Sequence, residues 1–204
     1  MQDVFRKIST KINSTLIPPR VLLSKFRFLD EQSRYSRACQ DDRYLPFFYY
    51  LGVYYQAKSV LDFGFGLGIN SSIYLMGNDK VENFLAIQEK SNEYYSSRLG
   101  IANVKQVYKN PFYVHVGEIY DDSFSKKLKE RKWDLVFLND KSTYDRYLFC
   151  LNTIWEYVEE NGLICMDYVN SHEFASKAYK DFCLIKNRNK YIFDTRYGVG
   201  TIVK

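Results

Sequence analysis

Apolar residues in the first part of the chain recur at helical spacing. Val4, Ile8 and Ile12 lie four residues apart, with basic residues off that line, and predict an amphipathic helix over residues 3–16. Two prolines at positions 18 and 19 end this helix, and a second helical stretch follows over residues 21–26. A third helix, whose aromatic residues we expect in the core, begins with Asp41 or Asp42 as its N-cap.

After residue 58 the pattern changes to short apolar runs that alternate with amphipathic stretches. The apolar runs predict five strands, at Ser59–Phe63, Asn83–Gln88, Phe112–Val116, Trp133–Leu138 and Gly162–Met166. The stretches after them predict helices at Asn70–Met76, Ser91–Leu99, Ser123–Arg131, Tyr144–Glu159 and Ser171–Ile185. This alternation predicts an α/β fold with a doubly wound, mostly parallel sheet that helices cover on both faces.

The end of the chain departs from the alternation. Residues 190–194 and 199–204 read as two strands, and the turn between them is too short for a crossover helix. One of these two strands must therefore run antiparallel to its neighbours.

Composition and charge limit the class of protein. With 46% hydrophobic residues, 10 Gly and 4 Pro in 204 residues, the chain is neither disordered nor collagen-like. Ten of the 29 Lys and Arg residues but only five of the 24 acids lie in the first 60 residues, so the net charge of +5 arises there. We expect a basic helical N-terminal cap over residues 1–44 and a balanced domain over residues 45–204. Nucleic acid is not expected as a partner, because acids interleave with these bases and the pI is about 8.8.

The cysteines and the lengths of the apolar runs indicate the cellular compartment of the protein. The four cysteines form no Cys-x-x-Cys pair and have no His at metal-ligand spacing: Cys39, Cys150, Cys165 and Cys183. Free thiols indicate a reducing compartment. No apolar run reaches the roughly 18–20 residues of a membrane span, and the start lacks a secretory leader. We therefore expect a soluble, cytoplasmic protein.

A cluster of glycines follows the first predicted strand. Gly64, Gly66 and Gly68 fall within five residues, directly after Asp62, and we call residues 64–68 the glycine turn. In a doubly wound sheet the ligand lies at such a strand end, where glycine lets it approach the backbone. No Lys follows these glycines, which argues against a phosphate-binding loop. Ile69 takes the last place of a dinucleotide fingerprint, which argues against a nicotinamide cofactor.

The remaining pattern, acid-x-Gly-x-Gly-x-Gly, resembles the class I S-adenosylmethionine-dependent methyltransferases over about residues 45–204. The resemblance implies a seven-stranded Rossmann-like sheet with a C-terminal antiparallel hairpin, and S-adenosyl-L-methionine as cofactor. It implies cofactor-binding roles for the first turn and its neighbours: Asp62, Gly64, Phe65, Gly66, Gly68 and Asn70.

Later strand ends extend this resemblance. The ribose-binding acid of the family is matched by Gln88 at the usual place and by Glu89 one residue later, and both stay candidates. Glu118 stands where the family's acid meets the adenine amino group. The segment Phe137–Tyr144 is similar to one in small-molecule and sugar O-methyltransferases, with Asn139 in place of an Asp and Ser142 in place of a His. We expect Asn139 to contribute to the cofactor site.

A hydroxyl acceptor must also lose a proton, so a base or a metal is needed near it. Strand ends offer Asp140, Asp167 and His172, of which we select His172 and Asp140 as catalytic candidates; a helix-start role is the alternative for His172. His115 lies inside a strand, where a core role is favoured. Catechol-type relatives hold magnesium with an adjacent Asp-Asn pair, which Tyr168 interrupts here, so no divalent metal is expected.

The sequence thus predicts a methyltransferase, O-directed, that acts on a small-molecule or sugar-like hydroxyl acceptor. The basic cap points to an anionic acceptor. A catalytically inactive protein of the same fold, serving as a binding or assembly subunit, is the alternative, and a homodimer is left open.

Overall fold

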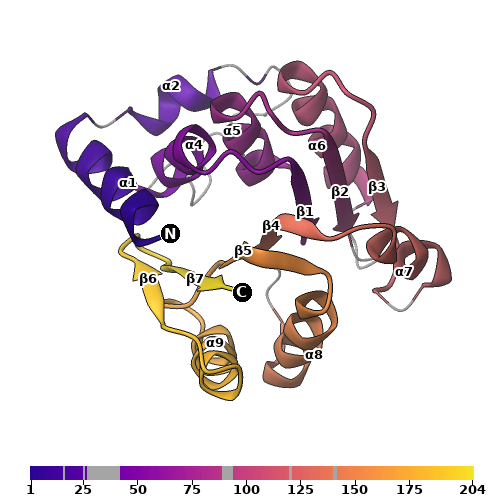
Figure 1. Cartoon of the computed structure of the whole chain (residues 1–204). Coiled ribbons are helices and arrows are strands. Elements are labelled where there is room, and N and C mark those ends of the chain that lie inside the picture. The colour runs from indigo at the N-terminus through magenta and orange to yellow at the C-terminus, as the bar shows by residue number, and fades with distance from the viewer. Residues whose placement is uncertain (16, 25, 27–41, 89–93, 120, 140–141) are drawn as a thin grey trace.

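The computed structural model describes residues 1–15, 17–24, 26, 42–88, 94–119, 121–139 and 142–204, with only the backbone of residues 94–96. Its described strands form one seven-stranded sheet in the order β3-β2-β1-β4-β5-β7-β6 (Figure 1). Their bounds are β1 Ser59–Phe63, β2 Asn83–Gln88, β3 Tyr113–Val116, β4 Trp133–Leu138, β5 Val158–Met166, β6 Tyr191–Phe193 and β7 Val199–Val203.

The first five strands are parallel, and β7 runs antiparallel to both β5 and β6. This confirms the predicted sheet and its C-terminal hairpin. In the register, Leu61 of β1 lies opposite Leu85 of β2 and Val136 of β4. All the parallel strands therefore deliver their carboxyl ends to one edge of the sheet, where the strand order reverses between β1 and β4.

Helices cover both faces of the sheet (Figure 1). One face carries α1 Gln2–Ser14, α2 Pro19–Leu23, α4 Tyr44–Tyr54, α5 Ile69–Gly77 and α6 Tyr94–Val107. The other carries α7 Asp122–Lys129, α8 Tyr144–Trp155 and α9 Glu173–Ile185. Among the described residues, none of these helices has the length and apolar character that crossing a bilayer requires.

Two hydrophobic cores lie on the two sides of the sheet. Neighbouring strand residues point to opposite faces, so Val60 joins one core and Leu61 the other. The first core includes Phe5, Ile8 and Ile12 of α1 together with α4, α5 and the sheet. The N-terminal helices thus share a core with the body, and the division between residues 44 and 45 stays a prediction.

Several element ends differ from the sequence prediction. The N-cap of α4 is Arg43, without a side-chain cap bond, so the choice of Asp42 was wrong, and Asp41 lies outside the described residues. Helix α6 continues past Leu99 to Val107, and β5 begins at Val158, before the predicted Gly162.

Candidate functional site

The glycine turn leaves the carboxyl end of β1 and leads into α5. Gly66 has φ +48° and Gly68 has φ +62°, a left-handed backbone that side chains other than glycine rarely adopt. Gly68 is also the N-cap of α5, and its backbone carbonyl accepts the N–H of Ser72 at 2.9 Å. The turn therefore reverses the chain within a few residues, beside the neighbouring strand end.

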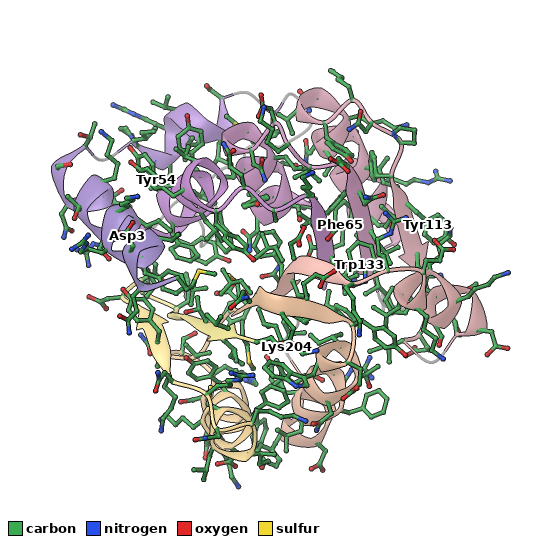
Figure 2. The ribbon with its side chains drawn as sticks, in the orientation of Figure 1. Asp3, Tyr54, Phe65, Tyr113, Trp133 and Lys204 are labelled. Atoms are coloured by element: carbon green, nitrogen blue, oxygen red, sulfur yellow. The ribbon has the colours of Figure 1, made fainter. Side chains whose placement is uncertain are left out.

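The turn is held from β2 and α6. The backbone N–H of Gly66 donates to the Gln88 side-chain oxygen at 2.5 Å, and the N–H of Phe65 donates to the Ile87 carbonyl at 3.2 Å. A Cβ on Gly100 of α6 would lie 2.6 Å from the Gly66 carbonyl oxygen, so the two backbones touch. Phe65, labelled in Figure 2, lies beside β1 and β2.

A cavity of about 300 Å³ opens over this turn at the carboxyl edge of the sheet. The described residues that line it are Tyr44, Asp62, Gly64, Phe65, Gly66, Leu67, Ile69, Asn70, Asn139, Asp167, Tyr168 and Tyr197. Half of them are the predicted cofactor residues Asp62, Gly64, Phe65, Gly66, Asn70 and Asn139. The cavity thus gathers residues from five stretches of the chain that are far apart in the sequence.

A continuous series of hydrogen bonds, which we call the site network, crosses the floor of the cavity. The Asp62 carboxylate accepts bonds from the Ser71 hydroxyl at 2.5 Å and from the Asn139 side-chain amide at 3.0 Å. The Asn70 amide nitrogen lies 3.2 Å from the Asn139 oxygen and 2.8 Å from the Tyr44 hydroxyl, and donates to both. The network therefore joins the ends of β1 and β4 to α5 and α4.

The network ends on a buried carboxylate. The Tyr44 hydroxyl donates to one oxygen of Asp167, at the end of β5, and the Tyr168 N–H donates to the other at 2.8 Å. Tyr168 has φ +65°, an uncommon conformation for a residue other than glycine. Tyr44, Tyr168 and Tyr197 were missed as site residues, because the aromatic run around Tyr44 reads as core and the sequence does not show that these segments meet.

Charge and burial set the state of Asp62. This side chain is 1% exposed, and burial raises its pKa to about 6, while the bonds from Ser71 and Asn139 act in the opposite direction. Among the described lining residues two are carboxylic acids, Asp62 and Asp167, and none is Lys or Arg. The described wall of the cavity is therefore suited to a ligand that carries positive charge.

Other predicted residues lie around or outside the cavity. Gly68 and Gln88 support the turn as described above. Glu118 is exposed, with its carboxylate 3.8 Å from Arg146, and is not among the described lining residues. Glu89 and Asp140 lie outside the described residues.

The two histidines have local partners. His172 is the N-cap of α9, and its Nδ1 accepts the N–H of Ala175 at 3.4 Å, the helix-start role that was its alternative reading. It is not among the described residues that line the cavity. His115 is buried in β3 and its Nε2 lies 2.9 Å from an Asp121 oxygen. Among the described residues no group of three His, Cys, Asp or Glu side chains is placed to hold a metal.

The fold has counterparts among known structures. The sheet order, the C-terminal hairpin and the glycine turn give the chain the Rossmann-like fold of class I S-adenosylmethionine-dependent methyltransferases. Neither a family model nor a curated protein sequence matches the chain. Solved structures do match, and because their sequence identities to this chain are low, the similarity shows a common fold and no more.

Three of these structures match almost end to end. The S-adenosylhomocysteine-bound methyltransferase PaMTH1 of Podospora anserina has a TM-score of 0.69 and 16% identity, over 98% of this chain and 94% of that one. An O-methyltransferase of Bacillus cereus bound to S-adenosylhomocysteine has a TM-score of 0.62 and 12% identity, over 97% of both chains. The O-methyltransferase TomG of Streptomyces achromogenes, involved in tomaymycin synthesis and bound to S-adenosylmethionine, has a TM-score of 0.60 and 14% identity, over 98% and 96%.

Proposed function

We propose that this protein is an S-adenosylmethionine-dependent methyltransferase that methylates a hydroxyl group of a small-molecule or sugar-like acceptor. The observation that carries the proposal is the glycine turn, which opens onto a cavity with the Asp62 carboxylate in its floor, where the strand order reverses. Bound S-adenosylmethionine or S-adenosylhomocysteine in structures of the same fold adds support.

The residues present fit this cofactor. A Cβ on Gly66 would find only the Gly64 carbonyl oxygen within 4 Å, at 3.9 Å, so the space above the turn is open to a ligand. S-Adenosylmethionine carries a sulfonium and an ammonium group, and the described wall offers two carboxyl groups and several aromatic rings. We assign Asp62, Gly64 and Gly66 to the methionine part of the cofactor.

The contacts to the nucleoside part stay predictions. The Gln88 side-chain oxygen already accepts a hydrogen bond from the Gly66 N–H. If Gln88 also binds the ribose, its side chain serves both the turn and the cofactor. Glu89 is the other candidate, and Glu118 remains the residue expected from the resemblance for the adenine.

When bound, the cofactor supplies an activated methyl group on a sulfonium. The chain's own part is to orient the acceptor oxygen toward that methyl group and to take up the hydroxyl proton. The side chains of the site network are held in fixed positions, because each of them is hydrogen-bonded to another member of the network.

The expected negative charge of the acceptor depends on basic residues of the N-terminal cap. Arg43 binds Asp194 and Asn13 through its guanidinium group, and Arg27, Arg34 and Arg37 lie outside the described residues. The described lining contains carboxylates without Lys or Arg, so an anionic acceptor gains no support from it.

Two measurements test the proposal. Calorimetric titration with S-adenosylhomocysteine should show one site per chain. Transfer of labelled methyl from S-adenosylmethionine should then be measured over phenol, catechol and sugar hydroxyl acceptors. Absence of cofactor binding would contradict the proposal. Binding without transfer to any acceptor would favour an inactive binding or assembly subunit, the alternative that Asn139 in place of the expected Asp suggests.

A further inference from the structure

A buried tyrosine–carboxylate pair forms one wall of the cavity and was not expected from the sequence. Tyr44 of α4 is 5% exposed and Asp167 at the end of β5 is 1% exposed, yet both line the cavity. The Tyr44 hydroxyl donates to Asp167 Oδ2 across 123 residues of sequence. Burying a carboxylate costs free energy unless hydrogen bonds compensate, so a buried acid facing a cavity calls for a functional explanation.

The local backbone aims this carboxylate. Asp167 Oδ1 accepts the backbone N–H of the next residue, Tyr168, at 2.8 Å. Tyr168 itself adopts φ +65°, which costs energy for a residue with a side chain. This conformation places both residues in the wall of the same cavity, on the side formed by β5 and the β6–β7 turn.

The proton of the pair resides on the phenol. Burial, and next the charge of Asp167, raise the pKa of Tyr44 well above its usual value of 10. Tyr44 therefore acts as a donor that holds Asp167 in place. Asp62, by contrast, lies under the glycine turn and accepts bonds from Ser71 and Asn139, on the side we assign to the cofactor.

We propose that Asp167 is the catalytic base that accepts the hydroxyl proton of the methyl acceptor, and that Tyr44 is its positioning residue. This inference rests on the proposed function. The acceptor oxygen gives up its proton to an Asp167 oxygen and its electron pair forms the bond to the methyl carbon. The carbon–sulfur bond breaks, and its electron pair stays on the sulfur, which becomes a neutral thioether. Asp167 then releases its proton to solvent.

Among the described residues, five titratable groups lie around the Asp167 carboxylate. They are Tyr44 from α4, Tyr168 and Cys165 on its own segment, Asp62 across the cavity floor, and Tyr197 from the β6–β7 turn. Burial, and next the Asp167 charge, raise the pKa of Cys165, so this thiol stays neutral. Asp62 is negatively charged above its pKa of about 6, and the cofactor's positive groups would offset that charge.

Two variants with matched controls test the proposal. Asp167→Asn keeps the shape and removes the base, and Tyr44→Phe removes the positioning bond. Asp134→Asn is the control for the first, because Asp134 also accepts backbone N–H bonds, from Lys58 and Ser59, at the opposite edge of the sheet. Tyr74→Phe is the control for the second, because the Tyr74 hydroxyl is buried and bonds to the Tyr55 carbonyl, away from the cavity.

The readout is kcat/KM for labelled-methyl transfer to the best phenol, catechol or sugar hydroxyl acceptor, with S-adenosylhomocysteine affinity measured in parallel. Asp167→Asn should lower kcat/KM roughly 10²- to 10⁴-fold, the usual contribution of a general base. Tyr44→Phe should lower it roughly 10- to 100-fold. Both control variants should stay within about threefold of wild type in kcat/KM and in cofactor affinity, and the two test variants should lose far less cofactor affinity than kcat/KM.

A structural role would not alter the dependence on the acceptor. In Asp167→Asn the rate should rise with pH and the loss should shrink for acceptors with a lower hydroxyl pKa. A variant that binds the cofactor and retains wild-type kcat/KM would overturn the proposal, as would wild-type protein that binds the cofactor but methylates none of the acceptors. If Asp167→Asn does not fold, the proposal is tested by the kcat/KM of Tyr44→Phe and by how its loss varies with the hydroxyl pKa of the acceptor. If the wild-type protein does not bind the cofactor, that result would instead contradict the proposed function itself.

Discussion

The side-chain amide of Asn139 donates a hydrogen bond to the carboxylate of Asp62 at 3.0 Å, joining the end of β4 to the end of β1. The resemblance to sugar O-methyltransferases predicts an Asp at position 139. In this chain the Asn139 side-chain amide donates a hydrogen bond to Asp62, whereas an Asp at this position would place a second negative charge beside it. The relationship explains how an Asn fits at this position: it stabilises the buried acid under the glycine turn.

Replacing Asn139 by Asp should therefore destabilise the protein in a pH-dependent way. Two carboxylates about 3 Å apart cannot both ionise cheaply, so one must keep a proton. We expect a loss of about 2–3 kcal/mol in the free energy of unfolding at pH 8 and a smaller loss at pH 5. Urea denaturation at both pH values measures this. Asn152→Asp, at an exposed amide on α8, is the control, and an equal loss at both pH values would contradict the expectation.

Asp62 itself should make stability depend on pH. Burial raises its pKa from 3.8 to about 6, so the folded protein holds this proton more tightly than the unfolded chain. The free energy of unfolding should therefore fall as the pH rises from about 4 to about 6, by roughly 3 kcal/mol, and level off above that range. Because other acids titrate in the same range, the test compares wild type with Asp62→Asn. The variant should lack this part of the slope, and identical pH profiles would show that Asp62 is not responsible.

The N-terminal helices should fold together with the rest of the chain. Ile8 of α1 is fully buried in the core that contains α4 and α5. Ile8→Ala should lower the free energy of unfolding by about 2–4 kcal/mol. Val21→Ala, at a side chain that is 49% exposed, should change it by less than about 0.5 kcal/mol.

The shape of the unfolding curve adds a second readout to that experiment. A shared core predicts one cooperative transition that moves as a whole in Ile8→Ala. A separate early transition, with the main one unmoved, would show that residues 1–44 form an independent unit.

The ends of some strands were predicted from the sequence to the exact residue. These are the strands whose apolar run has polar or glycine residues on both sides. Ser59–Phe63, Asn83–Gln88 and Trp133–Leu138 all lie as predicted, because each is buried on both faces of a parallel sheet. Helix α6 was predicted to end at Leu99, but it extends to Val107. In the structure the helix continues through Gly100, whose missing Cβ lets α6 contact the glycine turn.

The part of the candidate site that a local sequence motif forms was predictable. Asp62, Gly64 and Gly66 lie next to one another in the sequence and together in the cavity. The bond between Tyr44 and Asp167 was not predictable, because nothing in a single sequence specifies which of its many tyrosines meets a strand end 123 residues away. Tyr168 belongs to the same category, since its positive φ depends on how β5 ends.

The most direct test of the account is the affinity of the protein for S-adenosylhomocysteine when the glycine turn is blocked. A leucine at Gly66 would place its side chain in the open space of the cavity, and Asn187→Leu puts the same residue into a left-handed backbone at the end of α9. By isothermal titration calorimetry we expect tight binding in wild type and in Asn187→Leu, and a loss of at least roughly 100-fold in Gly66→Leu, since the ligand and the side chain would compete for one space. Wild-type affinity in a folded Gly66→Leu protein would contradict the account.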